Sequence, residues 1–381
     1  MISQADQQWM IHAIQLAKGG LYSTSPNPRV GCVLVRDGKL LAEGWHVRAG
    51  EGHAEVNALA ALAASGETAL GATAYVTLEP CSHQGKTPPC AEALVKAQVA
   101  RVVVGMQDPN PLVAGKGLAR LKGAGIDVVC GVQEAAAREL NPGFIRRMEG
   151  GRPWLTVKSA MSLDGRTAMA SGESQWITGP EARADVQRLR ARSCAIVTGV
   201  ETVLQDDAAL TVRPHSFAED TSGFWRQPLR VVLDTQLRTP LTATLLQGGG
   251  AVLISTVSQD QSKRQALQNA AAVPVDFIEL PQIDSGLDMS ALMDELAARG
   301  CNEVLIEAGA ALVGSALAAN LVDEWVVYMA PCVLGSAARP LANLPLQAMA
   351  EKRELNIVDV RAVGSDWRFT VKPKSANVEK D

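Results

Sequence analysis

Two patterns of apolar and polar residues alternate through the first 140 positions. Helical spacing of apolar residues follows Ser3, stops at Gly19-Gly20, and returns at residues 53–65, 91–97, 118–124 and 134–140. Short β-branched or apolar runs separate these stretches at residues 29–35, 40–45, 72–78, 101–105 and 126–130. Strands that alternate with helices predict an α/β domain in three layers, with helices on both faces of a sheet.

Glycine and proline interrupt this pattern near the middle of the chain. Asn141-Pro142-Gly143 is expected to end the last helix, and Gly150-Gly151-Arg152-Pro153 follows closely. A second α/β pattern then begins, with strands near 154–160, 195–199, 229–234, 251–256, 275–280, 303–308, 324–330 and 367–372 and helices at 181–192, 262–272, 288–299 and 310–320. The sequence therefore predicts one domain at residues 1–146, a second at 147–373, a polar surface loop at 214–227 and a polar tail at 374–381.

Composition and charge narrow the class of protein. The chain has 381 residues, of which 47% are hydrophobic, and its formal net charge is 36 − 40 = −4. A mildly acidic chain has no electrostatic footprint for a large nucleic acid. No apolar run approaches the roughly 20 residues that cross a bilayer. The N-terminus has no basic segment of a secretory signal, and seven scattered cysteines indicate a reducing compartment. We therefore expect a cytoplasmic enzyme-like protein without nucleic-acid or membrane partners.

A candidate metal site lies in the first half. His53-Ala54-Glu55 is followed by Pro80-Cys81 and then by Cys90. One imidazole and two thiolates suit tetrahedral zinc, and three protein ligands leave a fourth position for water. Zinc lowers the pKa of that water, and a carboxylate beside it can move its proton to a leaving amine. The pattern predicts a zinc deaminase site with His53, Cys81 and Cys90 as ligands and Glu55 as the proton carrier.

Each of these residues also has an ordinary explanation. A free cysteine is usually a small buried hydrophobe, a lone histidine is commonly a surface or capping residue, and Glu55 could complement the helix dipole. The four residues together favour the zinc site. Core packing is the expected role of the remaining cysteines, which are Cys32, Cys130, Cys194, Cys301 and Cys332.

Longer motifs in the first half resemble a known family. The stretches PNPRVGCVLV (26–35), GHAEVNAL (52–59), EPCSHQGKTPPC (79–90) and DPNPLVAGKG (108–117) are similar to the deaminase half of the bifunctional riboflavin-biosynthesis deaminase–reductases. The resemblance implies a cytidine-deaminase-like domain that deaminates 2,5-diamino-6-ribosylamino-4(3H)-pyrimidinone 5′-phosphate. It also implies that Asn27, His46, Lys86 and Thr87 contact this substrate. Lys86 suits a phosphate by its charge, although a solvated surface lysine is the alternative.

The second half shows a strand that runs into Gly309 and then a helix, at residues 303–317. This is neither a Walker A loop nor a GxGxxG motif, and a glycine before a helix is by itself a common connection. However, the stretches at 158–179, 188–213 and 305–312 resemble the reductase half of the same family, which implies a dihydrofolate-reductase-like α/β fold and NADPH. The implied NADPH contacts are Ala160, Trp176, Thr202, Asp206, Thr235 and the loop Gly309, Ala310, Ala311, Leu312, Val313, Gly314 and Ser315.

The resemblance assigns a second set of side chains to the reductase substrate, namely Lys158, Ser174, Arg190, Leu210, Arg213 and Glu307. Arginine suits a phosphate because its planar group can donate two parallel hydrogen bonds. One of Arg190 and Arg213 could instead be a solvated helix or strand residue, and Trp176 could be a core residue.

The expected protein is a bifunctional enzyme with one zinc ion per chain, NADPH and a phosphorylated pyrimidine as substrate, and we expect a homo-oligomer. Two other classes remain. One is a tRNA-base deaminase with an RNA-binding second half, which the charge of −4 and the absence of a basic stripe disfavour. The other is a zinc-stabilised interaction protein, which requires a fourth protein ligand.

Overall fold

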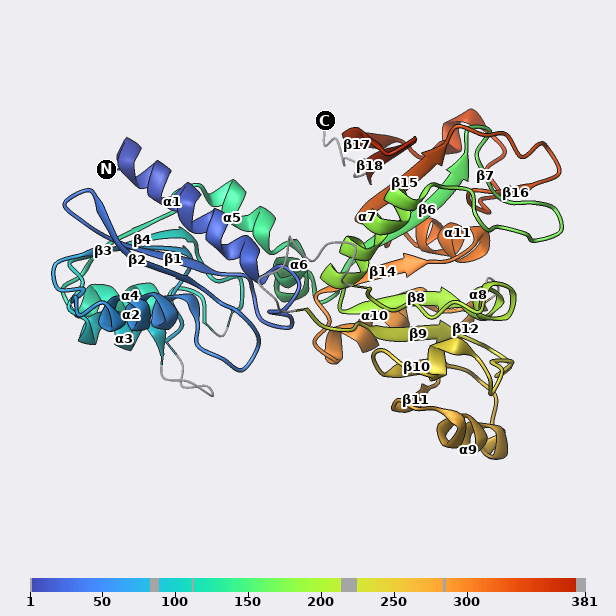
Figure 1. Ribbon diagram of the computed structural model, residues 1–381, viewed down its shortest axis with the longest axis horizontal. Helices are drawn as coiled ribbons and strands as arrows, with labels where there is room; N and C mark the ends of the chain where they lie inside the picture. The colour runs from blue at the N-terminus through green and yellow to red at the C-terminus, as the bar shows by residue number, and fades with distance from the viewer. Residues whose placement is uncertain (1, 83–88, 112, 214–224, 284–285, 375–381) are drawn as a thin grey trace. The chain divides into compact units, whose positions relative to one another are not determined.

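The structure, a computed structural model, describes residues 2–82, 89–111, 113–213, 225–283 and 286–374. The chain divides into two compact units, one ending at Arg152 and the other starting at Pro153 (Figure 1). Most of the predicted loop at 214–227 and the tail beyond Lys374 lie outside the described residues. Among the helices of the described part, none is both long and apolar enough to cross a membrane.

The first unit is a five-stranded sheet between two layers of helices. The strand order is β2 (Lys39–Trp45), β1 (Gly31–Arg36), β3 (Thr73–Leu78), β4 (Arg101–Met106) and β5 (Asp127–Cys130). Strand β1 is antiparallel to both neighbours, whereas β3, β4 and β5 are parallel. Figure 1 shows α1 (Gln4–Ala17) and α5 (Glu134–Leu140) on one face and α2 (Ala54–Ala64), α3 (Cys90–Lys96) and α4 (Lys116–Gly123) on the other. The predicted three-layer domain is confirmed.

Local sequence signals account for several boundaries in this unit. Ser3 Oγ accepts a hydrogen bond from the Asp6 amide, and the Ser3 amide donates to Asp6 Oδ2. This capping box begins α1, and a short 3₁₀ turn, η1 (Lys18–Gly20), follows its end. Asp37 and Gly38 both have positive φ angles, 52° and 70°, as a two-residue hairpin turn between β1 and β2 requires.

Helix α6 (Pro142–Gly150) was not predicted. Asn-Pro-Gly indicated a chain break, but Pro142 occupies the first turn of the new helix, where its fixed φ angle is favourable and its missing N–H removes no helical hydrogen bond. This helix belongs to the first unit, so the first unit extends to Arg152, beyond the boundary after residue 146 that the sequence suggests.

The second unit contains a nine-stranded sheet in its described part. The strands are, in spatial order, β11 (Val275–Ile278), β10 (Val252–Ser255), β9 (Leu229–Leu233), β8 (Ala195–Gly199), β14 (Glu303–Glu307), β6 (Trp154–Ser162), β15 (Glu324–Ala330), β18 (Asp366–Pro373) and β17 (Leu355–Val363). The pairs from β11 to β15 are parallel, and β18 and β17 are antiparallel additions at one edge. The sequence did not predict β17, because most of its residues are exposed and they lack a buried apolar face.

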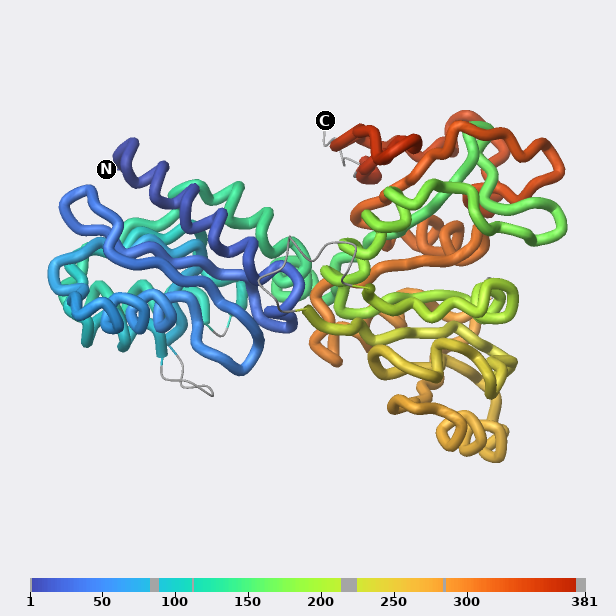
Figure 2. The backbone as a smooth tube through the Cα atoms, viewed as in Figure 1, coloured from blue at the N-terminus to red at the C-terminus, as the bar shows by residue number. Residues whose placement is uncertain are grey.

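Helices and short elements complete the second unit. The helices are α7 (Pro180–Arg192), α8 (Val200–Asp206), α9 (Gln261–Ala270), α10 (Met289–Ala298) and α11 (Ala310–Ala318). The short pieces are β7 (Arg166–Ala168), β12 (Gln282–Ile283), β13 (Gly286–Leu287), β16 (Arg339–Pro340), η4 (Thr244–Leu246) and η5 (Met349–Glu351). Figure 2 follows this green-to-red part of the chain as a continuous tube.

The strand order creates a topological switch point between β8 and β14. After β8 the chain passes through α8 to β9, on one side, whereas after β14 it passes through α11 to β15, beyond β6 on the other side. In open parallel sheets, ligands bind outside the carboxyl ends of strands at such a point. The ends of β8, β14 and β6 are therefore where the second unit is expected to hold a ligand.

Candidate functional site

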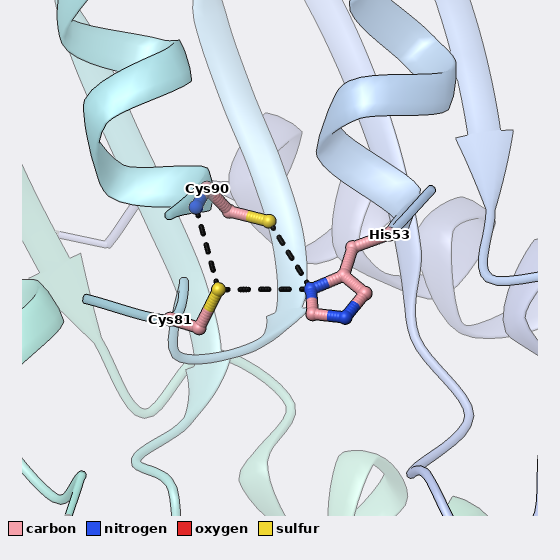
Figure 3. Close-up of side chains that lie close together, drawn as sticks. All are labelled: His53, Cys81 and Cys90. Atoms are coloured by element: carbon pink, nitrogen blue, oxygen red, sulfur yellow. Dashed lines mark hydrogen bonds between the residues drawn. The ribbon is translucent and has the colours of Figure 1, made fainter. Parts of the chain in front are cut away.

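Three side chains from separate elements meet in the first unit (Figure 3). His53 is the residue before α2 and its side chain makes no capping bond, so the imidazole is available to other groups. Cys81 follows the end of β3, and Cys90 is the first residue of α3. Helices α2 and α3 cover the same face of the sheet, and this brings their N-terminal ends to the carboxyl end of β3.

The distances between these side chains suit a zinc ion. His53 Nδ1 lies 3.6 Å from Cys81 Sγ and 3.3 Å from Cys90 Sγ, and the three donor atoms lie within 4.8 Å of one another. Zinc–sulfur and zinc–nitrogen bonds of about 2.3 and 2.0 Å in a tetrahedron separate sulfur from nitrogen by about 3.5 Å. One nitrogen and two sulfurs at these separations fit zinc, and no fourth protein ligand joins the group among the described residues.

Hydrogen bonds support the thiolate form of Cys81. The Cys90 side chain and its backbone N–H both donate to Cys81 Sγ, the backbone nitrogen at 3.3 Å, and these bonds lower the pKa of Cys81 to about 4. The hydrogen bond to Cys81 also raises the pKa of His53. The hydrogen bond to Cys81, together with burial, raises the pKa of Cys90. A metal needs the deprotonated ligands, so metal binding at this group releases protons.

Glu55 lies in the first turn of α2 and is 3% exposed. Burial raises the pKa of its carboxyl group, because the charged form loses its hydration. A raised pKa makes the carboxylate a stronger base, which favours its accepting a proton from an attacking water.

A cavity of about 570 Å³ opens beside these residues. His53, Glu55 and Cys81 line it, together with Asn27 and His46, which the family resemblance assigned to the substrate. Asn27 Nδ2 lies 3.2 Å from His46 Nε2, and His46 Nδ1 lies 3.0 Å from the Gly52 carbonyl oxygen. Since Nδ1 must donate to that carbonyl and burial lowers the pKa of His46, the imidazole is neutral and Nε2 is an acceptor. Lys86 and Thr87 lie outside the described residues.

Sequence reasoning missed two parts of this cavity. Phe144, Arg147 and Met148 of α6 line one wall, and their i, i+3, i+4 spacing could have revealed them had α6 been predicted. Glu79 is the other. Its buried carboxylate accepts hydrogen bonds from four backbone amides and thereby ties the end of β3 to the segment that leads into α4. The donors are the amides of Asp108, Gly115, Gly117 and Leu118.

The remaining cysteines do not all share a core role. Cys32 and Cys301 are buried and Cys194 and Cys332 are half-buried, but Cys130 is exposed. The prediction of core packing is therefore wrong for Cys130, because it ends β5, the edge strand of the first sheet.

In the second unit, three predicted substrate residues meet where the end of β14 lies beside the middle of β6. Lys158 and Glu307 are paired neighbours on these parallel strands. Arg190 of α7 donates to both carboxylate oxygens of Glu307, at 2.6 and 2.9 Å, and to the Thr211 carbonyl oxygen at 3.0 Å. Burial works against the Glu307 charge, but Arg190 and Lys158 lower its pKa below the usual value. Burial lowers the pKa of Lys158, against the attraction of Glu307. This cluster lies at the switch point.

Two further predicted residues, Ser174 and Asp206, are hydrogen-bonded at the end of α8. Ser174 Oγ donates to Asp206 Oδ1 at 2.9 Å, and Asp206 is close enough to influence Lys158 electrostatically. Thr202 lies on the same helix, and Ala160 follows Lys158 along β6. Thr235 follows β9, and its carbonyl oxygen accepts from Thr256 Oγ1 at 3.0 Å.

Other predicted residues take different positions. Trp176 is 68% exposed beneath the Arg183 guanidinium, which lies 4.6 Å from the ring centre, so the alternative of a core residue is wrong. Leu210 is buried with a φ angle of 52°, and the exposed Arg213 donates its backbone N–H to Gln187.

The predicted loop at Gly309 divides into two parts. Gly309 and Ala311 are exposed and Ala310, Leu312 and Ser315 are half-buried, around the start of α11. Val313 packs in the hydrophobic core, and a Cβ at Gly314 would lie 2.1 Å from the Asn343 carbonyl oxygen. The first part is available to a ligand at the switch point, whereas Val313 and Gly314 fix the helix against the rest of the unit.

Comparison with known proteins accounts for the two units. The family model of the cytidine and deoxycytidylate deaminase zinc-binding region matches residues 3–106, and that of the RibD C-terminal domain matches residues 153–369. The riboflavin biosynthesis protein RibD of Escherichia coli K12 is 48% identical over 367 residues, which cover 95% of this chain and 97% of that protein. The RibD of Haemophilus influenzae is 45% identical and covers 98% of each chain.

Solved structures agree with the same family over both units. Acinetobacter baumannii RibD, form 2, has a TM-score of 0.87 and 47% identity, and it covers 97% of this chain and 99% of that one. The Thermotoga maritima protein named diaminohydroxyphosphoribosylaminopyrimidine deaminase/5-amino-6-(5-phosphoribosylamino)uracil reductase has a TM-score of 0.83 and 31% identity, with 97% and 99% coverage. Together with the zinc-ligand geometry and the reductase-type second unit, these matches show that the chain belongs to the RibD family of bifunctional riboflavin-pathway deaminase–reductases.

Proposed function

We propose that the first unit deaminates 2,5-diamino-6-ribosylamino-4(3H)-pyrimidinone 5′-phosphate, and that the second unit reduces the ribosyl group of the product to ribityl with NADPH. The observation that carries the first step is the convergence of His53, Cys81 and Cys90 with Glu55 on one cavity that Asn27 and His46 also line. A cavity of several hundred cubic ångströms is the usual size of a small-molecule site.

The deamination residues divide into three roles. His53, Cys81 and Cys90 would hold zinc, which supplies an activated water at neutral pH when bound. Glu55 takes a proton from the attacking water and delivers it to the departing amine, so that a carbon–oxygen bond forms as the carbon–nitrogen bond breaks and ammonia leaves. Asn27 and the neutral His46 orient the pyrimidine ring through hydrogen bonds, and Lys86 and Thr87 are assigned to the substrate from the resemblance alone.

The reduction site has no need of a protein nucleophile. The substrate would be held where the end of β14 lies beside the middle of β6. The residues proposed to hold it are Lys158, Ser174, Arg190, Leu210, Arg213 and Glu307. Ala160, Trp176, Thr202, Asp206, Thr235 and the start of α11 would hold NADPH, which supplies a hydride when bound. The protein's contribution is to place the reacting carbon against the cofactor and to limit the access of water. The switch point between β8 and β14 supports this placement.

Four further expectations concern the number of zinc ions, the nicotinamide cofactor, the oligomeric state and the cellular location. One group of three metal-binding side chains is present among the described residues, which supports one zinc ion per chain. NADPH rather than NADH, a homo-oligomer and a cytoplasmic location stay predictions. The formal charge of −4 continues to disfavour a nucleic-acid substrate.

One assay tests the proposed function. The purified protein is given the diaminopyrimidine ribotide, and ammonia release is followed with and without NADPH. We expect ammonia in both cases and NADPH oxidation only after ammonia has been released. Ammonia release that requires NADPH, or NADPH oxidation without it, would contradict two consecutive sites.

A further inference from the structure

The segment of residues 207–213, which follows α8, carries two of the residues proposed to hold the reductase substrate, Leu210 and Arg213. None of its residues belongs to a helix or a strand. Side chains of other elements form hydrogen bonds with its backbone at residues 211, 212 and 213. The position of this segment therefore depends on the side chains that hold it.

Two glutamine side chains hold the end of the segment. Gln227 Oε1 accepts from the Val212 amide at 2.8 Å, and Gln227 Nε2 donates to the Val212 carbonyl oxygen at 3.0 Å. Gln187 Oε1 accepts from the Arg213 amide at 3.0 Å. In an extended chain, neighbouring residues direct their backbone N–H and C=O groups to opposite edges. The bonds are those expected of an extended segment that is held from both edges, at Val212 by Gln227 and at Arg213 by Gln187.

Gln187 connects this segment to the ion pair at the switch point. Gln187 and Arg190 are three residues apart on α7, so they lie on the same face of the helix. Arg190 donates to the Thr211 carbonyl oxygen and to both carboxylate oxygens of Glu307. Gln187 is 2% exposed, and a buried amide that lost its partner would cost free energy. One face of α7 therefore holds both the segment and Glu307, which fixes their relative position.

The backbone of Arg213 is fixed, whereas its side chain is exposed. Burial works against the charge of Glu307, and three cations lower the pKa of this carboxyl group, namely Arg190, Lys158 and Arg213. The Arg213 guanidinium is therefore close enough to act on Glu307 electrostatically. An arginine side chain is long and has many rotamers, so the position of its backbone decides which region the guanidinium can reach.

We propose that Gln187 is a positioning residue of the reductase site, whose bond to the Arg213 amide keeps the Arg213 guanidinium beside Glu307, where the substrate of the reduction would bind. This inference rests on the proposed function for the identity of that substrate. Gln187 acts through Arg213 and not on the reacting atoms. A guanidinium that is already in place loses less conformational freedom when the substrate binds, which favours binding.

The first test compares Gln187→Met with Gln187→Glu in the full-length protein, supplied with NADPH and the deaminated ribotide. Methionine is similar in size to glutamine but lacks the oxygen that accepts from the Arg213 amide. We expect Gln187→Met to raise the KM for the ribotide about 3- to 10-fold, the effect of one hydrogen bond, and to change kcat less. Gln187→Glu keeps an accepting oxygen and is expected to recover part of the loss. An unchanged ribotide KM in Gln187→Met would overturn the inference.

Arg213→Ala separates a positioning role of Gln187 from a merely structural one. Gln187→Met is expected to raise the ribotide KM when Arg213 is present and to leave it unchanged in the Arg213→Ala background, because the side chain through which Gln187 acts is then absent. A general disturbance of the second unit would raise the KM by the same factor in both backgrounds, and this result would contradict the proposed role.

Gln268→Met is a matched control. Gln268 of α9 donates to the Val275 carbonyl oxygen at 3.0 Å, so this variant also loses a bond between a glutamine side chain and the backbone. Val275 begins β11, the edge strand that three other strands separate from β14. The KM and kcat of Gln268→Met are therefore expected to equal those of wild type.

Hydrogen–deuterium exchange provides a readout that does not depend on turnover. Peptides that cover residues 207–213 are expected to exchange faster in Gln187→Met than in wild type, at an intermediate rate in Gln187→Glu and at the wild-type rate in Gln268→Met. Unchanged exchange in Gln187→Met would overturn the inference by itself. A wild type that oxidises no NADPH with the deaminated ribotide would instead overturn the proposed reduction, and the exchange rates would still decide whether Gln187 holds the segment.

Discussion

The two units build their sites in different ways. In the first unit, the metal-binding side chains come from residues 53–90 and sit at the ends of neighbouring elements, where local motifs place them. In the second unit, the central ion pair joins Arg190 to Glu307, which are 117 residues apart, and its position follows from strand order. A metal site requires particular ligand atoms, which are visible as residue types. A cofactor cleft depends on the order of the strands, which residue types do not show. The first kind of site is consequently easier to recognise in a sequence.

The units also differ in how their sites relate to stability. Glu55 is a buried carboxyl group with no cation among the described residues paired to it in the way that Arg190 is paired to Glu307, so its replacement by a neutral amide leaves no buried cation without a partner. Glu307 is buried beside Arg190, and its replacement leaves a buried cation without its charged partner. Changes at the two sites are therefore expected to separate activity from stability in the first unit and to couple them in the second.

The largest expected effect is on deamination in Glu55→Gln. The amide cannot carry a proton between water and the leaving amine, so we expect the rate of deamination to fall about 10³-fold. Metal analysis should show unchanged zinc, and reduction of the separately supplied deaminated intermediate should proceed at the wild-type rate. Loss of both activities in a folded variant would show that the two sites are not independent.

The next effect is on reduction in Glu307→Gln. Arg190 loses its paired carboxylate and the substrate loses the contact that we propose for Glu307, so kcat/KM for reduction is expected to fall about 100-fold. The thermal midpoint of the second unit is expected to fall as well, while deamination is retained. Calorimetry together with both assays measures these changes. Wild-type stability in this variant would contradict the coupling of stability and activity in the second unit.

The smallest of the three effects concerns an ion pair remote from both sites. Asp6 accepts from the Arg101 guanidinium at 2.7 and 3.1 Å and from Tyr75, and it is 1% exposed. Asp6→Asn is expected to destabilise the first unit by about 2 kcal/mol at pH 7, because charge-assisted hydrogen bonds are lost. Chemical denaturation measures this change, and both activities should be unaffected below the unfolding range.

The pH dependence of this effect has a definite sign. Burial opposes the Asp6 charge, but Arg101 and the Ser3 cap hold its pKa well below the usual value. The stabilisation is therefore fully present above the ordinary aspartate pKa and is lost as the pH falls toward the lowered one. The difference between wild type and Asp6→Asn should narrow below about pH 4. Glu92→Gln, which breaks the exposed pair with Arg120, is a matched control and should change stability little at any pH. A difference that grows on acidification would contradict the assignment.

The candidate metal site of the first unit could be predicted because its residue types are chemically restricted. The donor atoms of His53, Cys81 and Cys90 lie within reach of one ion, as their spacing in the sequence predicts. Glu55 lies in the first turn of the helix that follows His53. The wall formed by α6 could not be predicted in the same way. Asn141-Pro142-Gly143 is compatible with either a chain break or a new helix. Two hydrogen bonds between the Asn141 side chain and the Arg29 backbone fix the start of the new helix.

The second unit shows what local patterns leave undetermined. Most of its parallel strands are apolar runs that the sequence predicts, but the same runs are compatible with many strand orders. The pairing of β14 between β8 and β6 creates the switch point and brings Lys158, Arg190 and Glu307 together. Val313 and Gly314 belong to the loop that the sequence predicts to contact NADPH. In the structure, Val313 packs in the hydrophobic core and Gly314 packs against the Asn343 backbone.

By itself, the amino-acid sequence determined the two α/β patterns, the side chains that could hold a metal ion and the type of chemistry such a site can perform, because these depend on residue type and on spacing over a few turns. Only the tertiary structure decided that α6 forms a wall of the cavity in the first unit and that Cys130 lies at an exposed sheet edge. It also decided that the candidate site residues of the second unit lie together at the switch point between β8 and β14. These features depend on contacts between segments far apart in the chain, and such contacts are selected by packing of the whole unit rather than by any local pattern.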